Sequence, residues 1–351
     1  LPIIINLIRI PIQYSIISTI LGLSSVLLLS AFFSKIPEKG SDANLGRQLL
    51  VIGIVSAISA LIPIIISGRT VRMFNVLDRY TITSIISVGF IIVGFLLFKL
   101  SNYMRKTILI LFVASSITSN LMNGYWHKIM WDKQKDLWWQ LYWRAPNIQD
   151  NAMLILDFPP ITQNIPFKDI INKVKWYRFY WVDYQIWAPG NLFFNYHNSP
   201  QTHFSGDFLE DKKTLDKIKN QVTESITDRN ITYTRDFRNT VIISTPSDTS
   251  CLWVLDKEKN EFPSYANKLL KTNISYSDVN KLVKSESPIT PPREIFGSEP
   301  PHDWCYYFQK ASLARQLKDW DRLSQLKKEV IQKNLKPRDS NEWLPFQKDL
   351  R

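Results

Sequence analysis

The chain has 351 residues, with 43 Lys and Arg against 31 Asp and Glu, and it contains 12 Trp but only 2 Cys. This composition excludes a small disulfide-built domain and a collagen-like or low-complexity chain, and it provides enough apolar residues for a sizeable core. Residues 1–125 hold only ten Lys or Arg and three Asp or Glu, so most charges follow later in the chain. Because the later charges include no dense Lys or Arg block, a nucleic-acid partner is not expected.

Four apolar runs in the first third of the chain predict membrane-spanning helices. They are Ile10 to Phe33, Leu49 to Ser67, Ile82 to Phe98 and Thr107 to Met122. About 20 apolar residues cross a bilayer core of about 30 Å, and shorter runs adapt by snorkelling or local thinning. Residues 1–124 are therefore expected to form a membrane α-helical bundle of about four spans, with the buried helices of a globular bundle as the alternative.

Basic residues separate the apolar runs. Their distribution slightly favours an orientation that leaves the C-terminal part outside the cytoplasm. Arg69, Arg72 and Arg79 precede the third run, where guanidinium groups suit the phosphate of an anionic lipid or of a lipid-linked diphosphate. Ordinary anchoring of helix ends is the alternative role for these side chains. The apolar start at Leu1 is compatible with the tail of an earlier span, which would make the chain a fragment.

An aromatic stretch, residues 125–150, follows the apolar runs. Its rings are Tyr125, Trp126, Trp131, Trp138, Trp139, Tyr142 and Trp143. Aromatic side chains with a polar edge prefer the headgroup zone of a membrane, so the stretch predicts an interfacial amphipathic helix. An aromatic core segment of the following domain is the alternative.

Short apolar runs bounded by turn residues begin at Ala152 and predict a mixed α/β domain over residues 151–286. The predicted strands are Ala152 to Leu156, Trp176 to Val182, Asn191 to Tyr196, Ile231 to Phe237, Val241 to Ser244 and Cys251 to Leu255. Leu209 to Val222 has helical spacing between them. The sequence leaves the parallel or antiparallel order of the strands open.

The last segments of the chain form a linker and a helical hairpin. Residues 287–301 are rich in Pro and predict an extended linker. Within residues 302–351, apolar residues share helical faces before and after Asp319, which can cap the second helix. This αα-hairpin resembles one tetratricopeptide unit, and it is expected to dock on the domain through its Trp residues.

Few residues point to specific chemistry. Glycine loops of the phosphate-binding types do not occur, and no cofactor is expected. His197 and His203, with Asp207, have a spacing compatible with metal binding, but surface His is the favoured interpretation, so no metal site is predicted. Trp187, His197 and His203 are the candidates for binding a glycan or a partner protein. Cys251 and Cys305 read as small buried residues that could pair outside the cytoplasm.

Several strings in the chain resemble a family. They are Asp78-Arg-Tyr-Thr, Trp138-Trp-Gln-Leu-Tyr-Trp-Arg-Ala-Pro, Trp187-Ala-Pro-Gly-Asn, Trp304-Cys-Tyr-Tyr-Phe-Gln-Lys, Asp319-Trp and Glu342-Trp-Leu-Pro-Phe. They are similar to a group of uncharacterised polytopic bacterial envelope proteins with a soluble C-terminal domain, some of which look distantly like membrane glycosyltransferases that use lipid-linked sugar donors. In such transferases the catalytic acidic residue lies in an early loop outside the cytoplasm, which would precede Leu1 or be absent, so no catalytic residue is assigned.

Together these patterns predict an integral protein of the bacterial plasma membrane, with the bilayer as one partner. Its domain outside the cytoplasm would be non-catalytic and would bind an envelope protein or a glycan. The alternative is the C-terminal portion of a polytopic glycosyltransferase with a lipid-linked sugar donor. An acidic residue in an early loop would favour the transferase, and only Glu38 and Asp42 are available there.

Overall fold

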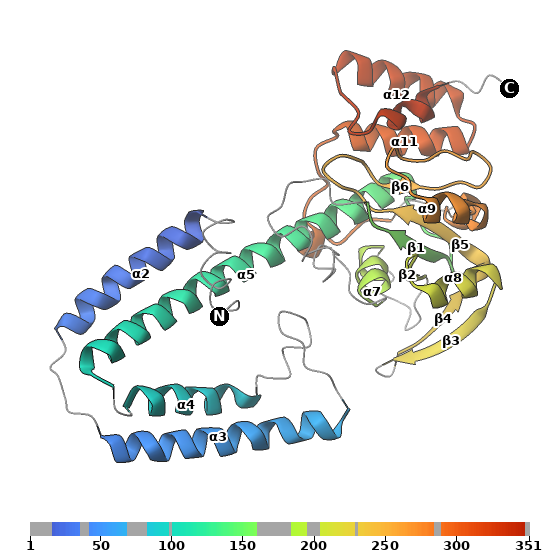
Figure 1. The fold of residues 1–351 in the computed structure, drawn as a ribbon. Helices are drawn as coiled ribbons and strands as arrows, with labels where there is room; N and C mark the ends of the chain where they lie inside the picture. Colours follow the sequence, from blue (N-terminus) through green and yellow to red (C-terminus); the bar gives the residue numbers. More distant parts are fainter. Residues whose placement is uncertain are drawn as a thin grey trace. The chain divides into compact units, whose positions relative to one another are not determined.

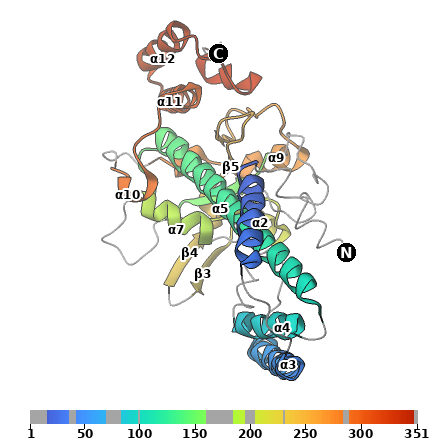
Figure 2. The same ribbon diagram turned by 90° about the vertical axis from the view of Figure 1, so that its left-hand side faces the viewer.

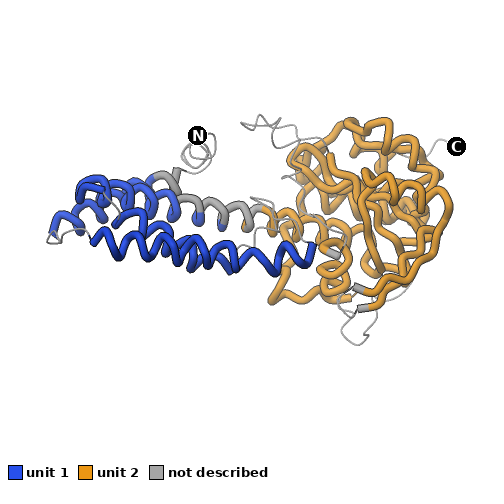
Figure 3. The backbone as a smooth tube through the Cα atoms, turned by 60° about the horizontal axis from the view of Figure 1, so that its bottom comes forward, with its two compact units in different colours: residues 1–127 blue, residues 128–351 orange. Residues whose placement is uncertain are grey.

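The computed structural model describes residues 16–35, 42–68, 83–97, 100–159, 184–194, 204–228, 231–283 and 289–347. The chain divides into two compact units, which are called here the N-terminal unit (residues 1–127) and the C-terminal unit (residues 128–351) (Figure 3). The 43-residue helix α5 (Asn102–Arg144) begins in the first unit and ends in the second.

Apolar helices make up the described part of the N-terminal unit. They are α2 (Ile16–Ser34), α3 (Ala43–Ile66), α4 (Ile85–Leu97) and the first part of α5. Asp42 caps α3, because its carboxylate accepts a hydrogen bond from the backbone N–H of Leu45 at 3.0 Å. The helices α3 and α4 lie side by side (Figure 1).

Glycines determine how closely α3 and α4 approach each other. A Cβ atom at Gly94 would lie 2.7 Å from the backbone nitrogen of Leu50, and one at Gly53 would lie 2.7 Å from the side chain of Ile91. Both distances are too short for real atoms, so only glycine allows this packing. Small residues at a helix contact have this effect in many helix pairs.

The expected four-span bundle is wrong. Among the described residues, α3 is the one helix that is long and apolar enough to cross a membrane, with 24 residues, or about 36 Å at 1.5 Å per residue. The apolar helix α4 has 13 residues, about 20 Å, which is too short. The predicted fourth span, Thr107 to Met122, is a segment of α5 whose second half is rich in Ser and Asn. In the part of the chain that the structure describes, the fold is instead a mixed α/β structure with a single candidate span.

A four-stranded sheet forms the centre of the C-terminal unit, in the order β2-β1-β5-β6. Its strands are β1 (Met153–Asp157), β2 (Ser205–Phe208), β5 (Thr240–Ser244) and β6 (Trp253–Val254). The strands β2 and β5 both pair with β1 in parallel, and β6 joins β5 antiparallel. A separate hairpin pairs β3 (Thr223–Asp228) with β4 (Ile231–Asp236).

Both faces of the sheet are covered, because alternate residues of a strand point to opposite sides. Met153 and Ile155 face a core shared with α8 (Lys212–Lys219), α9 (Lys268–Asn273) and α11 (Trp304–Gln316). Leu154 and Leu156 face a second core. The last turns of α5 and the helix α7 (Tyr184–Phe193) supply this second core, and they lie next to each other in Figure 2.

The aromatic residues near the C-terminal end of α5 belong to that second core, with Trp131 and Tyr142 packed against it. Trp138, Trp139 and Trp143 are all at most 4% exposed, and Trp139 packs edge-on against Phe193 of α7, with ring centroids 5.2 Å apart. This placement corresponds to the aromatic-core alternative rather than to a helix in a headgroup zone.

The C-terminal helical hairpin consists of α11 and α12 (Trp320–Gln332). Asp319 caps α12 by accepting a hydrogen bond from the backbone N–H of Arg322. A disulfide joins Cys251, just before β6, to Cys305 at the start of α11. The hairpin is thus covalently tied to the sheet.

Candidate functional site

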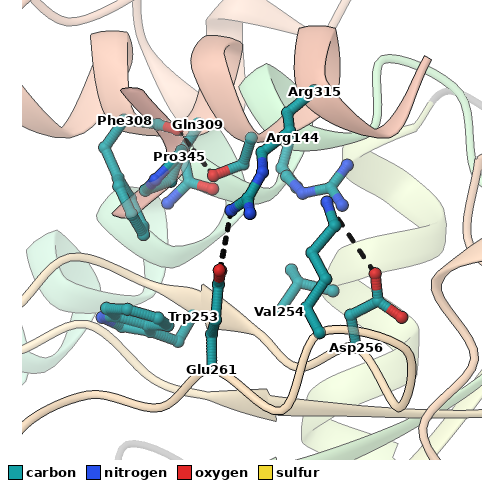
Figure 4. A pocket seen from close by; sticks show the side chains of 11 residues that line it. Arg144, Trp253, Val254, Asp256, Glu261, Phe308, Gln309, Arg315 and Pro345 are labelled. Carbon is teal, nitrogen blue, oxygen red and sulfur yellow. Dashed lines mark hydrogen bonds and ion pairs between the residues drawn. The ribbon is translucent and has the colours of Figure 1, made fainter. Parts of the chain in front are cut away.

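A small cavity lies in the C-terminal unit between the end of α5, the strand β6, the helix α11 and the loop that follows β6 (Figure 4). Its volume is about 40 Å³. Charged side chains from three parts of the chain line it: Arg144, Arg315, Lys259, Asp256 and Glu261. With three cations and two carboxylates, the lining carries one net positive charge.

Arg144 forms the inner part of the cavity. It is the last residue of α5, where a cation is favoured by the helix dipole, and Pro146 stands just beyond the helix end. Its side chain is 4% exposed. Its Nη2 donates a 2.6 Å hydrogen bond to Oε1 of Gln316, whereas its buried Nη1 has no hydrogen-bond partner among the described residues.

Gln316 is itself held in place. Its Nε2 donates a 3.2 Å hydrogen bond to the backbone carbonyl of Val279, which orients its Oε1 toward Arg144. The partner of Arg144 is therefore neutral. Burial lowers the pKa of Arg144 to about 10, so the guanidinium still carries its charge at neutral pH. The cavity thus contains a buried positive charge with free donor capacity.

Arg315, near the end of α11, is neutralised by a carboxylate. Its Nη1 contacts Oε1 of Glu261 at 2.8 Å and Oε2 at 3.0 Å. The guanidinium also donates to the backbone carbonyl of Leu344 at 3.4 Å. This ion pair leaves Arg144 without a carboxylate at hydrogen-bond distance among the described residues, although the charge of Asp256 partly offsets the effect of burial on the pKa of Arg144.

Lys259 and Asp256 occupy the loop after β6 at the rim of the cavity. Their charged groups are 3.9 Å apart, and their side chains are 24% and 13% exposed. Asp256 organises the loop, because its backbone carbonyl accepts hydrogen bonds from the N–H groups of Lys259 and Asn260. Burial, and the nearby charges of Arg315 and Arg144, lower the pKa of Lys259. The cations therefore lie close enough to repel one another.

Aromatic rings and an amide complete the wall. Trp253 of β6 and Phe308 of α11 have ring centroids 5.1 Å apart. Gln309 donates a 2.7 Å hydrogen bond to the backbone carbonyl of Leu252. The lining, with aromatic walls and a few polar groups, is of the kind found in small-molecule sites, and the volume of about 40 Å³ admits only a small group of a larger ligand.

Of the predicted site residues, the structure describes only Trp187, which does not line this cavity. Arg69, Arg72, Arg79, His197 and His203 lie outside the described residues. Trp187 lies on α7, is 6% exposed and packs against Tyr233 of the β3–β4 hairpin, with ring centroids 4.7 Å apart. In that position its ring serves the packing of the hairpin.

No group of three His, Cys, Asp or Glu residues that could hold a metal ion occurs in the described part of the chain. Asp207, whose spacing from His197 and His203 is compatible with metal binding, lies on β2 and is buried. Its carboxylate accepts a 2.8 Å hydrogen bond from Thr214 and a 3.3 Å contact from Arg235. Burial raises the pKa of Asp207, and these contacts tie β2 to α8 and β4.

The sequence-based reasoning missed the residues of the cavity. Arg144 stands in the string Trp143-Arg-Ala-Pro, within the aromatic stretch that predicts an interfacial helix. The one available signal was its place directly before the Ala-Pro pair that ends the helix. Nothing in the local sequence places Arg315 or the loop at Lys259 beside it, since that proximity depends on the tertiary fold.

Comparisons with protein-family models, with curated proteins and with solved structures find no match to this chain. By length and composition, α3 (Ala43–Ile66) can cross a membrane. The geometry of the cavity and of its surroundings is therefore the basis for assigning a function.

Proposed function

We propose that this chain is a membrane-attached protein of the bacterial cell envelope whose C-terminal unit is a non-catalytic glycan-binding module outside the cytoplasm. The cavity lined by Arg144, Trp253 and Phe308 carries this proposal. Sugars are commonly held by aromatic walls together with a few charged or amide groups, and this cavity has both.

Two observations support the location. The disulfide between Cys251 and Cys305 includes both cysteines of the chain, and disulfides persist in oxidising compartments outside the cytoplasm. The helix α3 is long and apolar enough to cross a membrane, and its terminal residue Ile66 is 80% exposed. Large exposed apolar side chains along a helix are favoured in lipid.

The binding role is tested by filling the cavity. Ser312 lines it from α11 and is partly buried, so Ser312→Leu places a larger side chain in a space of about 40 Å³. The matched control is Ser324→Leu, on the exposed side of α12. Each purified full chain in detergent is titrated calorimetrically with glucose, N-acetylglucosamine, glucuronate and galacturonate.

We expect saturable binding of at least one of these sugars by the wild-type chain and by Ser324→Leu. Ser312→Leu should weaken that binding at least about tenfold, because a filled cavity cannot admit the group of the sugar that binds inside it. Near-ultraviolet circular dichroism checks that the variant remains folded. If none of the four sugars binds the wild-type chain, or if Ser312→Leu binds as well as Ser324→Leu, the proposed binding role is wrong.

A further inference from the structure

We infer that the cavity recognises a carboxylate group, borne by an acidic sugar, through the guanidinium of Arg144. This inference rests on the proposed glycan-binding function and names the class of ligand that the same site takes. Its starting point is the buried Nη1 of Arg144, which has no hydrogen-bond partner among the described residues and belongs to a side chain that lines the cavity.

An unpaired buried charge calls for an anion. Taking a guanidinium out of water is costly unless a partner of opposite charge and hydrogen bonds compensate. Gln316 supplies one neutral acceptor to Nη2. Glu261 is engaged by Arg315, and the carboxylate of Asp256 lies 3.9 Å from Lys259. An entering carboxylate would supply the missing acceptor at Nη1, and charge-assisted hydrogen bonds of this kind are the strong ones.

The net charge of the residues that line the cavity also favours an anionic ligand. Three cations face two carboxylates, so a single added negative charge makes the lined cavity neutral. A neutral sugar would leave the excess charge in place, whereas a dianionic group would reverse it. The ligand is thus expected to present one singly charged group to the cavity.

The size of the cavity favours a carboxylate over a phosphate. A space of about 10–15 Å³ on this measure holds one water-sized group, so 40 Å³ holds about three such groups. A carboxylate has three heavy atoms, while a phosphate has five. The rest of the sugar would remain at the rim, where Lys259 and Glu261 are only partly buried.

The experiment compares full-length variants in detergent by calorimetric titration with sodium glucuronate, glucose and inorganic phosphate. Arg144→Met removes the charge and keeps most of the side-chain length. Arg322→Met on α12 is the matched control, since the Arg322 side chain is 42% exposed and lies 3.9 Å from Glu329. Lys259→Gln, at the rim, is a second variant that leaves the buried part of the unit unchanged.

The wild-type chain should bind glucuronate at least about tenfold more tightly than glucose, because only glucuronate offers a charged acceptor to the guanidinium of Arg144. Arg144→Met should bring the glucuronate affinity down to that for glucose, and Lys259→Gln should lower it about twofold to fivefold through the weaker field at the rim. Arg322→Met should leave the affinity unchanged. If Arg144→Met does not fold, two other results test the inference. Weaker glucuronate binding by Lys259→Gln and a preference of the wild-type chain for glucuronate over glucose would support it, and the absence of either would contradict it.

Three results would overturn the inference. Equal affinity for glucose and glucuronate would remove the role of the charge while leaving the proposed glycan-binding function intact. Tighter binding of inorganic phosphate than of glucuronate would assign the cavity to phosphate. Undiminished glucuronate binding by a folded Arg144→Met chain would place the carboxylate elsewhere. Absence of binding to every sugar would remove the proposed function as well, so the two failures are distinguishable.

Discussion

Glu342 is a fully buried carboxylate that joins two distant parts of the C-terminal unit. Its Oε1 accepts a 2.6 Å hydrogen bond from the backbone N–H of Cys251, and its Oε2 accepts a 2.8 Å bond from the backbone N–H of Arg338. One side chain thus connects the disulfide at β6 with the turn that precedes the C-terminal 3₁₀ helix η5 (Ser340–Phe346). Burial is the largest influence on this carboxyl and raises its pKa above the ordinary value of 4.5.

The raised pKa predicts how stability depends on pH. Below the ordinary pKa of 4.5, which applies to the unfolded chain, Glu342 is protonated in both states. As the pH rises toward the higher folded pKa, the unfolded state loses its proton first, so the free energy of unfolding decreases. Glu342→Gln cannot ionise and should not show this decrease. The stability of the wild-type chain minus that of Glu342→Gln should therefore fall as the pH rises from 4 to 7.

Thermal unfolding of both chains, followed by tryptophan fluorescence at pH 4, 5, 6 and 7, measures this difference. The subtraction cancels the other titrating groups, among them Asp207, whose pKa burial also raises. Glu342→Gln is expected to be less stable at every pH, because its amide cannot accept both backbone hydrogen bonds. A difference that is constant, or that grows with pH in favour of the wild-type chain, would contradict the raised pKa.

At the scale of elements, the contact between α3 and α4 depends on glycine. Gly94→Ala would place a Cβ atom 2.7 Å from the backbone nitrogen of Leu50 and 2.8 Å from the backbone oxygen of Gly46. Backbone atoms cannot move aside as a side chain can, so the helices must separate. We expect Gly94→Ala to destabilise the N-terminal unit by about 1–3 kcal/mol, the usual cost of overpacking.

Gly89 on the same helix is the matched control. A Cβ atom there meets no atom within 4 Å, and Ala favours a helix over Gly by about 1 kcal/mol. Gly89→Ala should therefore leave the stability unchanged or raise it. Thermal loss of helical circular dichroism in detergent compares the two variants with the wild-type chain. If the unfolding temperature shifts by the same amount and in the same direction in Gly94→Ala and Gly89→Ala, close packing at Gly94 does not limit the helix contact.

The two central strands were predictable because the strand propensity of their residues agrees with their burial in the folded sheet. The predicted strand Ala152 to Leu156 corresponds to β1, and Val241 to Ser244 corresponds to β5. Both segments are rich in branched apolar residues and are buried on both faces of the sheet, as parallel strands usually are. Local propensity and tertiary burial therefore agree in these two strands.

Other elements were missed because tertiary contacts override local preference. The strand β2 has the sequence Ser-Gly-Asp-Phe, which has little strand propensity, but Gly206 lets it pass close to Ile186. The predicted strand from Asn191 to Tyr196 is wrong where it overlaps α7, a helix that contains Pro189. Burial of Ile186 and Phe193 against the sheet stabilises that helix. Propensity alone cannot reveal such contacts.

At the scale of the whole molecule, the prediction of a membrane segment depended on runs of apolar residues, whose helical limits the sequence does not mark. The run Ile82 to Phe98 contains a helix of only 13 residues, α4. The cavity was also beyond prediction, because α5, β6 and α11 are far apart in the chain and meet only in the folded unit. The sequence shows which charged and aromatic residues the chain contains, but not which of them lie side by side in the folded unit.

The location of the C-terminal unit is the remaining property of the whole molecule to be tested. Both cysteines of the chain are paired in the disulfide, so Ser324→Cys, on an exposed part of α12, adds the one free thiol. A maleimide that does not cross membranes should label Ser324→Cys in intact cells as fully as after lysis, because the unit is proposed to lie outside the cytoplasm. The wild-type chain should stay unlabelled in both cases, since an oxidising compartment keeps the disulfide closed.

A cytoplasmic protein with an exposed cysteine, labelled only after lysis, is the control for intact membranes. Denaturation with reduction should expose two further thiols per chain, those of Cys251 and Cys305. Labelling of Ser324→Cys only after lysis would place the unit in the cytoplasm, where disulfides are rare. Labelling of the native wild-type chain would mean that the two cysteines are reduced. Either result would remove the support that the disulfide gives to a module outside the cytoplasm, while binding of sugars by the purified chain would still be measured independently.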